Sequence, residues 1–476
     1  MDLKKINLKF SKIELPKLEL PKFKLPKIKM PELKIGDIKA KIPIIQGGMG
    51  VGISLSKLSS AVANEGGIGV IAANAIGMIE PDYFKNGVEA NMRALRKEIR
   101  KARSLSDGII GVNIMIALND FQNMLQVSIE EKVDIVFLGA GLPLRGIPIE
   151  KIKRANVKVV PIVSSARAVK LIFKYWQKNF DTIPDGVVVE GPKAGGHLGF
   201  KEEDIENPDF AIENIIPGVI KEVKEFEKEL AREIPVIAAG GIFNGKDIYK
   251  FLKLGANGVQ MGSRFVATEE CDADINFKRS FVNSKKEDIV IIHSPVGMPG
   301  RAILNSFLKD VNSGKKKVFK CPWRCLESCK AEKANYCISI ALDNARKGIL
   351  KHGFAFAGSN VYRIDKIVPV KDLINEITED YLAVVENGIV RIKNEYEKVK
   401  KKLIGLKGEY EQTIERASRY LKEEYGKAFT KDSDKLKVET EKNFNKINWL
   451  KSEYIENFRL IDEIRAKFMA KTFTLV

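Results

Sequence analysis

Residues 234–265 read IPVIAAGGIFNGKDIYKFLKLGANGVQMGSRF. This stretch begins with an apolar run that ends in two glycines, continues through the helical pattern GKDIYKFLKLG, and returns to a second apolar run, GANGVQMGS. Apolar runs rich in β-branched residues are typical of parallel strands that are buried on both faces. The order therefore predicts a strand, a helix and a second strand, which is the repeating unit of an α/β protein.

Six further apolar runs precede this unit: IPIIQGG, GGIGVIAA, IIGVNIMIAL, VDIVFLGAG, VKVVPIVSS and DGVVVEG. Helical patterns such as SKLSSAVANEGG, ARAVKLIFKYWQKN and PGVIKEVKEFEKELARE separate them. Eight such units predict a (β/α)8 TIM barrel over residues 41–367, with an open doubly wound sheet as the alternative. In a barrel the chemistry lies at the carboxyl ends of the strands, which is where this chain concentrates glycine.

The composition is that of a globular protein. Of the 476 residues, 45% are apolar and 30% are charged, so the chain can bury a large core. It contains no uninterrupted apolar run of about 18 residues, and its N-terminus MDLKKINLKF lacks the apolar centre of a secretory signal. These features predict a cytoplasmic protein without a membrane span.

Residues 1–40 form a basic segment with a proline repeat. Prolines recur every five residues, at Pro16, Pro21, Pro26 and Pro31, which excludes a helix and predicts an extended arm. The first 42 residues hold 12 lysines and 5 acidic residues, whereas the whole chain has a net charge of +18. Such an arm is either a solvated tail or a surface for nucleic acid or an acidic carrier protein.

Residues 371–476 are highly charged, and part of this region has a regular apolar period. The stripe alternates spacings of three and four along Ile389, Ile392, Tyr396, Val399, Leu403, Leu406 and Tyr410. This period predicts a helical appendage, either a hairpin or coiled coil that links two copies of the chain or a helix packed on the barrel wall.

Two glycine-rich strand ends predict a phosphate site. Gly240 and Gly241 follow the seventh apolar run, and Gly262 and Ser263 follow the eighth. Glycine lets the backbone approach a ligand closely, a following helix N-terminus favours an anion, and barrels commonly bind phosphate after strands seven and eight. Tight turns without a ligand are the alternative interpretation.

A histidine on a glycine loop is the candidate catalytic residue. His197 lies in VVVEGPKAGGHLGF, between glycines at the end of a predicted strand, and only three histidines occur in the chain. A histidine in that place suits proton transfer or the polarisation of a substrate oxygen, although a structural role is the alternative. Glu190, in the same strand end, is a candidate for holding a ribityl hydroxyl or for orienting the loop.

The first strand opens a further glycine loop, IPIIQGGMGVGIS. This loop has the look of a dinucleotide fingerprint, but the acidic residue that should follow a second strand is not evident, which argues against a Rossmann NAD fold.

Together these motifs resemble the nitronate monooxygenase family, also called 2-nitropropane dioxygenase-like, which includes the FMN-dependent enoyl-acyl-carrier-protein reductases. The match runs in order through PIIQGGMGVGIS, GVNIMIAL, LGAGLP, EGPKAGGHLGF, IPVIAAGGI and GANGVQMGSRFVATEE. The resemblance implies an FMN-binding TIM barrel whose His197 acts on the substrate. It implies a cofactor site that comprises Gly47, Gly48, Met49, Asn113, Glu190, Gly195, Gly196, Gly240, Gly241, Gln260, Gly262 and Ser263, with the ring over the first three.

Two features depart from that family pattern. GPKAGGH places Lys193 where many relatives have a glutamate, which puts a cation at the rim; it either favours an anionic substrate or is a solvated side chain. CPWRCLESCKAEKANYC places Cys321, Cys325, Cys329 and Cys337 within 17 residues. Four thiolates can hold an iron-sulfur cluster or zinc, although neither standard spacing is matched and a set of reduced thiols is the alternative.

The sequence thus predicts an FMN-dependent oxidoreductase that oxidises nitronates or similar carbon acids, with His197 as the base. The first alternative is reduction of an enoyl thioester with NAD(P)H as the electron donor, which an iron-sulfur cluster would favour. The second is a flavoprotein that acts on or binds RNA through its basic arm.

Overall fold

The computed structural model describes residues 28–321, 325–326, 329–426 and 433–473. Contacts divide the chain into two compact units, Met30–Leu382 and a second unit made of Met1–Lys29 with Ala383–Val476. Most of the predicted proline arm, including Pro16, Pro21 and Pro26, lies outside the described residues.

Eight parallel strands close into a barrel, so the predicted TIM barrel is confirmed. In chain order the strands are β3 (Ile44–Gln46), β4 (Ile68–Ala72), β5 (Ile109–Met115), β6 (Ile135–Gly139), β7 (Lys158–Val163), β8 (Val187–Glu190), β10 (Val236–Ala239) and β11 (Gly258–Met261). The ring closes where β11 pairs with β3, in the register Gln260 to Ile45. Each of the eight apolar runs contains one of these strands.

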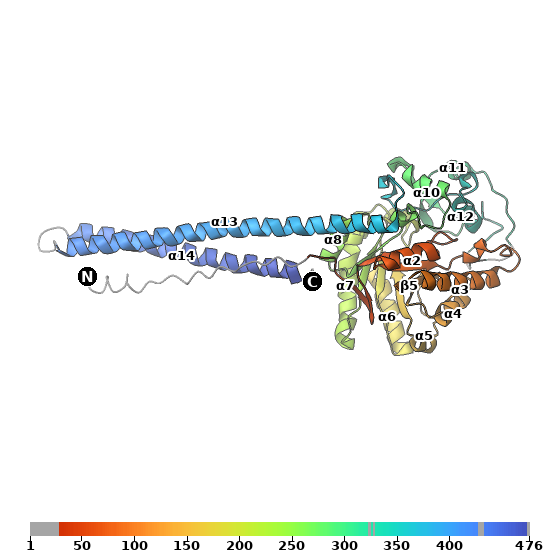
Figure 1. The fold of residues 1–476 in the computed structure, drawn as a ribbon, viewed down its shortest axis with the longest axis horizontal. Coiled ribbons are helices and arrows are strands. Elements are labelled where there is room, and N and C mark those ends of the chain that lie inside the picture. Colours follow the sequence, from red (N-terminus) through yellow and green to blue (C-terminus); the bar gives the residue numbers. More distant parts are fainter. Residues whose placement is uncertain (1–27, 322–324, 327–328, 427–432, 474–476) are drawn as a thin grey trace. The chain divides into compact units, whose positions relative to one another are not determined.

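Helices cover the outside of the barrel (Figure 1). They are α2 (Ser56–Asn64), α3 (Gly87–Leu105), α4 (Phe121–Glu130), α5 (Ile149–Ala155), α6 (Ala166–Phe180), α7 (Ile212–Leu230) and α8 (Gly245–Lys253). In α6 the apolar side chains of Val169, Phe173 and Trp176 are buried, and the Ser165 side chain caps the first turn by accepting from the Ala168 amide. An apolar stripe against the strands and a polar outer face explain why these segments fold as helices.

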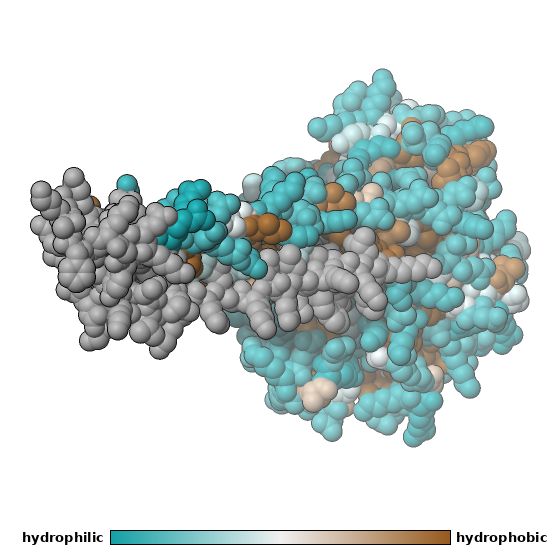
Figure 2. Space-filling model, turned by 60° about the vertical axis from the view of Figure 1, so that its left-hand side comes forward, coloured by the Kyte–Doolittle hydropathy of each residue, from teal (hydrophilic) through white to brown (hydrophobic). Residues whose placement is uncertain are grey.

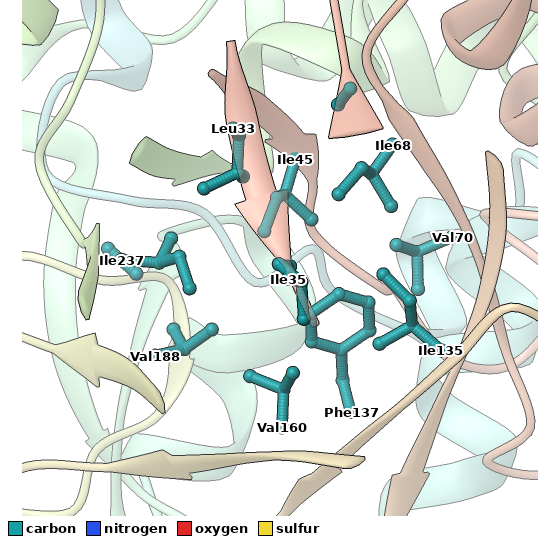
Figure 3. Close-up of a cluster of buried hydrophobic side chains, with 12 residues drawn as sticks. Leu33, Ile35, Ile45, Ile68, Val70, Ile135, Phe137, Val160, Val188 and Ile237 are labelled. Atoms are coloured by element: carbon teal, nitrogen blue, oxygen red, sulfur yellow. The ribbon is translucent and has the colours of Figure 1, made fainter. Parts of the chain in front are cut away.

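A hairpin closes the amino-terminal end of the barrel. Strands β1 (Leu33–Ile35) and β2 (Ile38–Ala40) pair antiparallel, and Leu33 and Ile35 pack among the interior side chains of the barrel strands (Figure 3). Asp37 in the hairpin turn pairs with Lys158, the first residue of β7, at 2.7 Å. This hairpin lies within residues 1–40, for which an extended arm was predicted, and it packs on the barrel through buried apolar residues, Leu33, Ile35 and Ala40.

The segment after β11 forms smaller elements. They are α9 (Ser263–Val266), α10 (Ile275–Val282), β12 (Ile289–His293), β13 (Pro299–Ile303), α11 (Ser306–Asn312) and α12 (Ile338–Arg346). The sheet order β12-β13-β9 brings in β9 (Gly196–His197) from the loop after β8. Short 3-10 turns lie at Ile76–Ile79, Glu202–Asp204, Pro208–Phe210, Lys286–Asp288, Leu350–His352 and Val361–Arg363.

Two long helices form most of the second unit. They are α13 (Val370–Gly426), which begins in the barrel unit, and α14 (Ser433–Phe473), and they lie side by side (Figure 1). Lys402 pairs with Glu453 at 2.6 Å and Lys446 with Glu409 at 3.1 Å, so the helices are antiparallel. The predicted stripe from Ile389 to Tyr410 is buried, as are Ile447, Leu450, Tyr454, Ile461 and Ile464 of α14.

The surface offers no membrane-spanning element. Within the described chain, no helix combines the length and the apolarity needed to cross a membrane. Among the residues coloured in Figure 2, the face shown is mainly hydrophilic, with small hydrophobic patches between hydrophilic residues.

Candidate active site

A cavity of about 340 Å³ lies at the carboxyl ends of the barrel strands. Every glycine, polar and histidine residue predicted for the site lines it: Gly47, Gly48, Met49, Asn113, Glu190, Gly195, Gly196, His197, Gly240, Gly241, Gln260, Gly262 and Ser263. The parallel strands explain this convergence, because all eight carboxyl ends lie at the same end of the barrel. The four cysteines are not among the lining residues.

The loop after β3 forms one wall of the cavity. The Gly47 amide donates to the Met261 carbonyl at 2.8 Å, and the Met49 amide donates to the Ser54 hydroxyl at 2.9 Å. A Cβ on Gly48 would collide with the Asn113 side chain, so the loop approaches β5 as closely as a residue without a side chain allows. This contact fixes the loop against Asn113, beside which the flavin ring was predicted.

The loops after β10 and β11 form the adjoining wall, because β11 pairs with both β3 and β10. Gly240 and Gly241 have φ of +96° and +80°, a conformation that glycine adopts without strain. The Asn360 side-chain amide donates to the Gly241 carbonyl at 2.6 Å. The Gly358 amide donates to the Ser263 hydroxyl at 2.9 Å, so the segment around residue 360 supports both loops from outside the barrel.

Side chains cap the start of α8, the helix that follows one of the two loops predicted to bind phosphate. The Asp247 carboxylate accepts from the Phe243 amide at 2.9 Å, and the Asn244 side chain accepts from the Asp247 amide at 3.1 Å. This capping box uses the amides of Phe243, Asn244 and Asp247. The anion would instead meet the glycine loops that precede the helix.

His197 is held by strand pairing and by one side chain. It lies in β9, opposite Gly300 of β13, and its Nε2 is 2.7 Å from the Ser294 hydroxyl. The Phe356 ring contacts the imidazole edge-on, with centroids 5.0 Å apart. Burial lowers the pKa of His197 to about 4, so the imidazole is neutral at neutral pH.

Glu190 ends β8 at the floor of the cavity. Burial raises the pKa of its carboxyl group to about 7, and no cation of the described residues lies within ion-pair distance of it. A carboxyl group with that pKa holds its proton part of the time at neutral pH and can then donate a hydrogen bond to a ligand.

Comparison with known proteins identifies the family. A model of the family described as "Nitronate monooxygenase" matches residues 32–380, most of the chain. The chain belongs to the nitronate monooxygenase family. It is an FMN-dependent oxidoreductase of the nitronate monooxygenase type, as predicted.

The chain is similar to one relative in sequence and to two proteins of solved structure described below. The chain is similar to a "Probable nitronate monooxygenase" of Staphylococcus saprophyticus, with 28% identity over 58% of this chain and 79% of that protein. It is also similar to FabK from Thermotoga maritima, with 29% identity over 73% of this chain and 95% of that one and a TM-score of 0.57. The nitroalkane oxidase of Streptomyces ansochromogenes is 20% identical over 72% of this chain and 96% of its own, with a TM-score of 0.56, and shows the fold alone.

Sequence reasoning missed three residues of this nitronate monooxygenase-type site. Ser294 and Phe356 contact His197, and Asn360 holds the Gly241 carbonyl. All three lie beyond the strands of the barrel, 97 or more positions from the residue they contact. Local spacing carries no signal for contacts at that separation.

The cysteine segment lies beside the cavity, but the predicted metal site is not supported. Cys325 Sγ is 3.5 Å from the Ser339 hydroxyl, and Leu326 and Ser339 line the cavity. Burial raises the pKa of the Cys325 thiol, and the nearby thiols of Cys321 and Cys329 raise it further, which favours the protonated form. Within the described residues, no group of three or more His, Cys, Asp or Glu side chains is arranged to hold a metal ion.

Proposed function

We propose that the protein oxidises nitronates or similar carbon acids at a bound FMN, with His197 as the base. The observation that carries the proposal is the neutral imidazole of His197 in the wall of the cavity, with the glycine loops in the other walls. Nitronate monooxygenases are the family to which the chain belongs, and the substrate class is inferred from it.

The residues around the cavity fit a flavin mononucleotide. Gly240, Gly241 and Gly262 offer backbone amides that donate no hydrogen bond to another described residue, as a phosphate group requires. Side chains at Gly48 and Gly240 would fill the space or strike neighbouring atoms, since a Cβ on Gly240 would lie 2.8 Å from the Gly191 carbonyl oxygen. Asn113, Gln260 and Glu190 supply polar groups between these loops.

Flavin, when bound, accepts the electrons that leave the substrate carbon. The protein's own residues would remove the proton from the substrate. In the tautomer that donates Nε2–H to the Ser294 hydroxyl, His197 presents a bare Nδ1 that can take a proton from a carbon acid. Burial lowers the pKa of His197, but an anionic substrate beside the ring raises the pKa of the imidazole again, so the base strengthens as the substrate anion forms.

The test is a reductive half-reaction without oxygen. Purified protein is loaded with FMN and mixed anaerobically with the nitronate of a small nitroalkane and, separately, with the neutral nitroalkane, while the flavin absorbance is followed. We expect bleaching with both substrates and a slower reaction with the neutral one, which must first lose its proton. If neither bleaches the flavin but reduced nicotinamide does, the proposal is wrong.

A second candidate function is NAD(P)H-dependent reduction of an enoyl thioester. It is favoured by the 29% identity to Thermotoga maritima FabK over nearly all of that chain, and by the exposed cation Lys193 at the cavity rim, where an anionic donor or thioester would approach. Under anaerobic conditions, oxidation of NADPH or NADH that depends on an added enoyl thioester would establish this function. The same flavin-loaded protein serves both tests.

Two further measurements concern a bound metal and a second copy of the chain. Iron, zinc and sulfide can be quantified in anaerobically purified protein to decide whether the four cysteines hold a metal. Sedimentation analysis can decide whether α13 and α14 link two copies of the chain. Iron together with sulfide would favour the enoyl thioester alternative, whereas the number of copies does not bear on the chemistry.

A further inference from the structure

Lys193 belongs to the loop after β8, and its side chain lies against Gly241 in the loop after β10. A Cβ placed on Gly241 would be 2.8 Å from Cβ and 3.1 Å from Cδ of Lys193. The aliphatic stem of the lysine therefore passes directly over Gly241, in space that a larger residue at position 241 would occupy. Both residues line the cavity, and Lys193 is exposed at its rim.

The loop that carries Lys193 is held rigidly. The Lys193 carbonyl accepts from the Ser359 amide at 3.1 Å, and the Ala194 amide donates to the Gly191 carbonyl at 3.1 Å. A Cβ on Gly195 would collide with the backbone of Ala357, so the two loops are in contact over their main chains. Only the side chain of Lys193 remains free to adjust to a ligand.

Lys193 is the available cation among the charged residues of the cavity. The other basic residue in the lining is Arg264, which pairs with Glu376 at 2.8 Å and lies 4.3 Å from the centre of the Phe243 ring. His197 is neutral at neutral pH because burial lowers its pKa. Among the described residues, no carboxylate lies within ion-pair distance of the Lys193 ammonium.

A phosphate monoester at these loops would be bound more tightly by a nearby cation. Such a group carries between one and two negative charges at neutral pH, and a compact ammonium ion on a flexible stem is a common partner for it. The capping box of α8 uses the amides of Phe243 and Asp247, so these two amides are not available to an anion. The amides at Gly240 and Gly241 supply hydrogen bonds but no full charge.

We propose that the Lys193 ammonium binds the phosphate group of the flavin over Gly241 and thereby selects FMN over unphosphorylated riboflavin. This inference rests on the proposed FMN site. Under this proposal the Lys193 side chain recognises the negative charge of the phosphate. The backbone amides of the glycine loops donate hydrogen bonds to the same group regardless of its charge.

The experiment is a titration of flavin-free protein with FMN and with riboflavin, followed by flavin fluorescence. The variants are Lys193→Gln, Lys193→Arg and, as a matched control, Lys201→Gln, which removes an exposed lysine that pairs with Glu203 and does not line the cavity. We expect Lys193→Gln to weaken FMN binding by about three- to thirtyfold and to leave riboflavin binding unchanged. Lys193→Arg should keep most of the FMN affinity, and Lys201→Gln all of it.

The salt dependence of FMN binding gives a second test of the ionic contact. FMN affinity of the wild type should fall as salt rises, and the fall should be smaller in Lys193→Gln because one ionic contact is gone. Equal losses for FMN and riboflavin, or no loss for either, would overturn the inference. If Lys193→Gln instead raises KM for NADPH and leaves FMN affinity intact, the ammonium reads a phosphate of the nicotinamide donor and the inference is also wrong.

Failure of the proposed function gives a different result. Wild-type protein that binds neither flavin would refute the FMN site itself. Wild-type protein that binds FMN and riboflavin equally well, by contrast, would leave the flavin site in place and refute only the role of Lys193.

Discussion

The two ends of the barrel are closed in opposite ways. At the amino-terminal end, the β1–β2 hairpin inserts Leu33 and Ile35 among interior side chains, and both are essentially inaccessible to solvent. At the carboxyl-terminal end, glycines take the place of such side chains and leave a cavity of about 340 Å³. The same eight strands therefore serve stability at one end and chemistry at the other, which predicts that substitutions at the two ends have separable effects.

The largest effect should come from His197 at the open end. His197→Ala removes the proposed base, so turnover of the neutral nitroalkane, which must first lose a proton, should fall by about 10²- to 10⁴-fold while FMN binding persists. Steady-state kinetics with flavin content measured on the same sample checks this. Unchanged turnover with nitronate and nitroalkane alike would remove His197 from the mechanism.

The next effect concerns the closed end. Leu33→Ala leaves a void beside the interior side chains, and the free energy of unfolding of the barrel unit should fall by about 2–5 kcal/mol. Urea unfolding followed by tryptophan fluorescence measures the loss. FMN affinity and turnover per folded molecule should match the wild type, and a large loss of either would show that the two ends are coupled.

A smaller effect is expected at the glycine loops. Gly241→Val places a side chain where the Lys193 stem lies and strains a φ of +80°, so FMN affinity should fall by roughly tenfold or more. Gly314→Val is the matched control, because Gly314 has a similar φ of +85° and no atom near its absent side chain. Full flavin occupancy in Gly241→Val would contradict the assignment of this loop to the phosphate.

The smallest effect is a pH dependence at Glu190. Its pKa in the folded protein, about 7, lies above its ordinary value of 4.5, so the folded state keeps a proton that the unfolded state releases between these pH values. The contribution of this group to stability is therefore fully present below about pH 4.5 and is lost as the pH rises to 7. Glu190→Gln lacks this titration, so its Tm should rise relative to the wild type by a few degrees over that interval. A constant difference in Tm from pH 4.5 to 7 would show that Glu190 is not the group responsible.

Much of the fold could be predicted because local pattern determines it. Each of the eight apolar runs contains a barrel strand, since burial on both faces demands an uninterrupted apolar segment. The β1–β2 hairpin was missed because its lysines and the preceding proline repeat conceal an alternation, Leu33 and Ile35 inward and Lys34 outward, that is only three residues long. The closing of the barrel end depends on that alternation.

The site was predictable only where residues lie directly at strand ends. His197, Gly241 and Gln260 follow or end strands, and a barrel brings all strand ends together. Ser294, by contrast, reaches His197 through pairing of β9 with β13, a contact between segments 97 positions apart. The metal prediction rested on four cysteines within 17 residues, but closeness in sequence does not set the side-chain geometry, and the described residues hold no group arranged to bind a metal ion.

The small sheet that joins β9 to β13 and β12 has a consequence for engineering and for evolution. The barrel that would hold the flavin is complete at Met261, but the orientation of His197 depends on residues 289–303, which come later in the chain. His197 itself lies in the barrel segment, whereas Ser294, which contacts its Nε2, lies between β12 and β13. Substitutions within residues 289–303 are therefore a direct route to altered basicity of His197 without a change to the glycine loops.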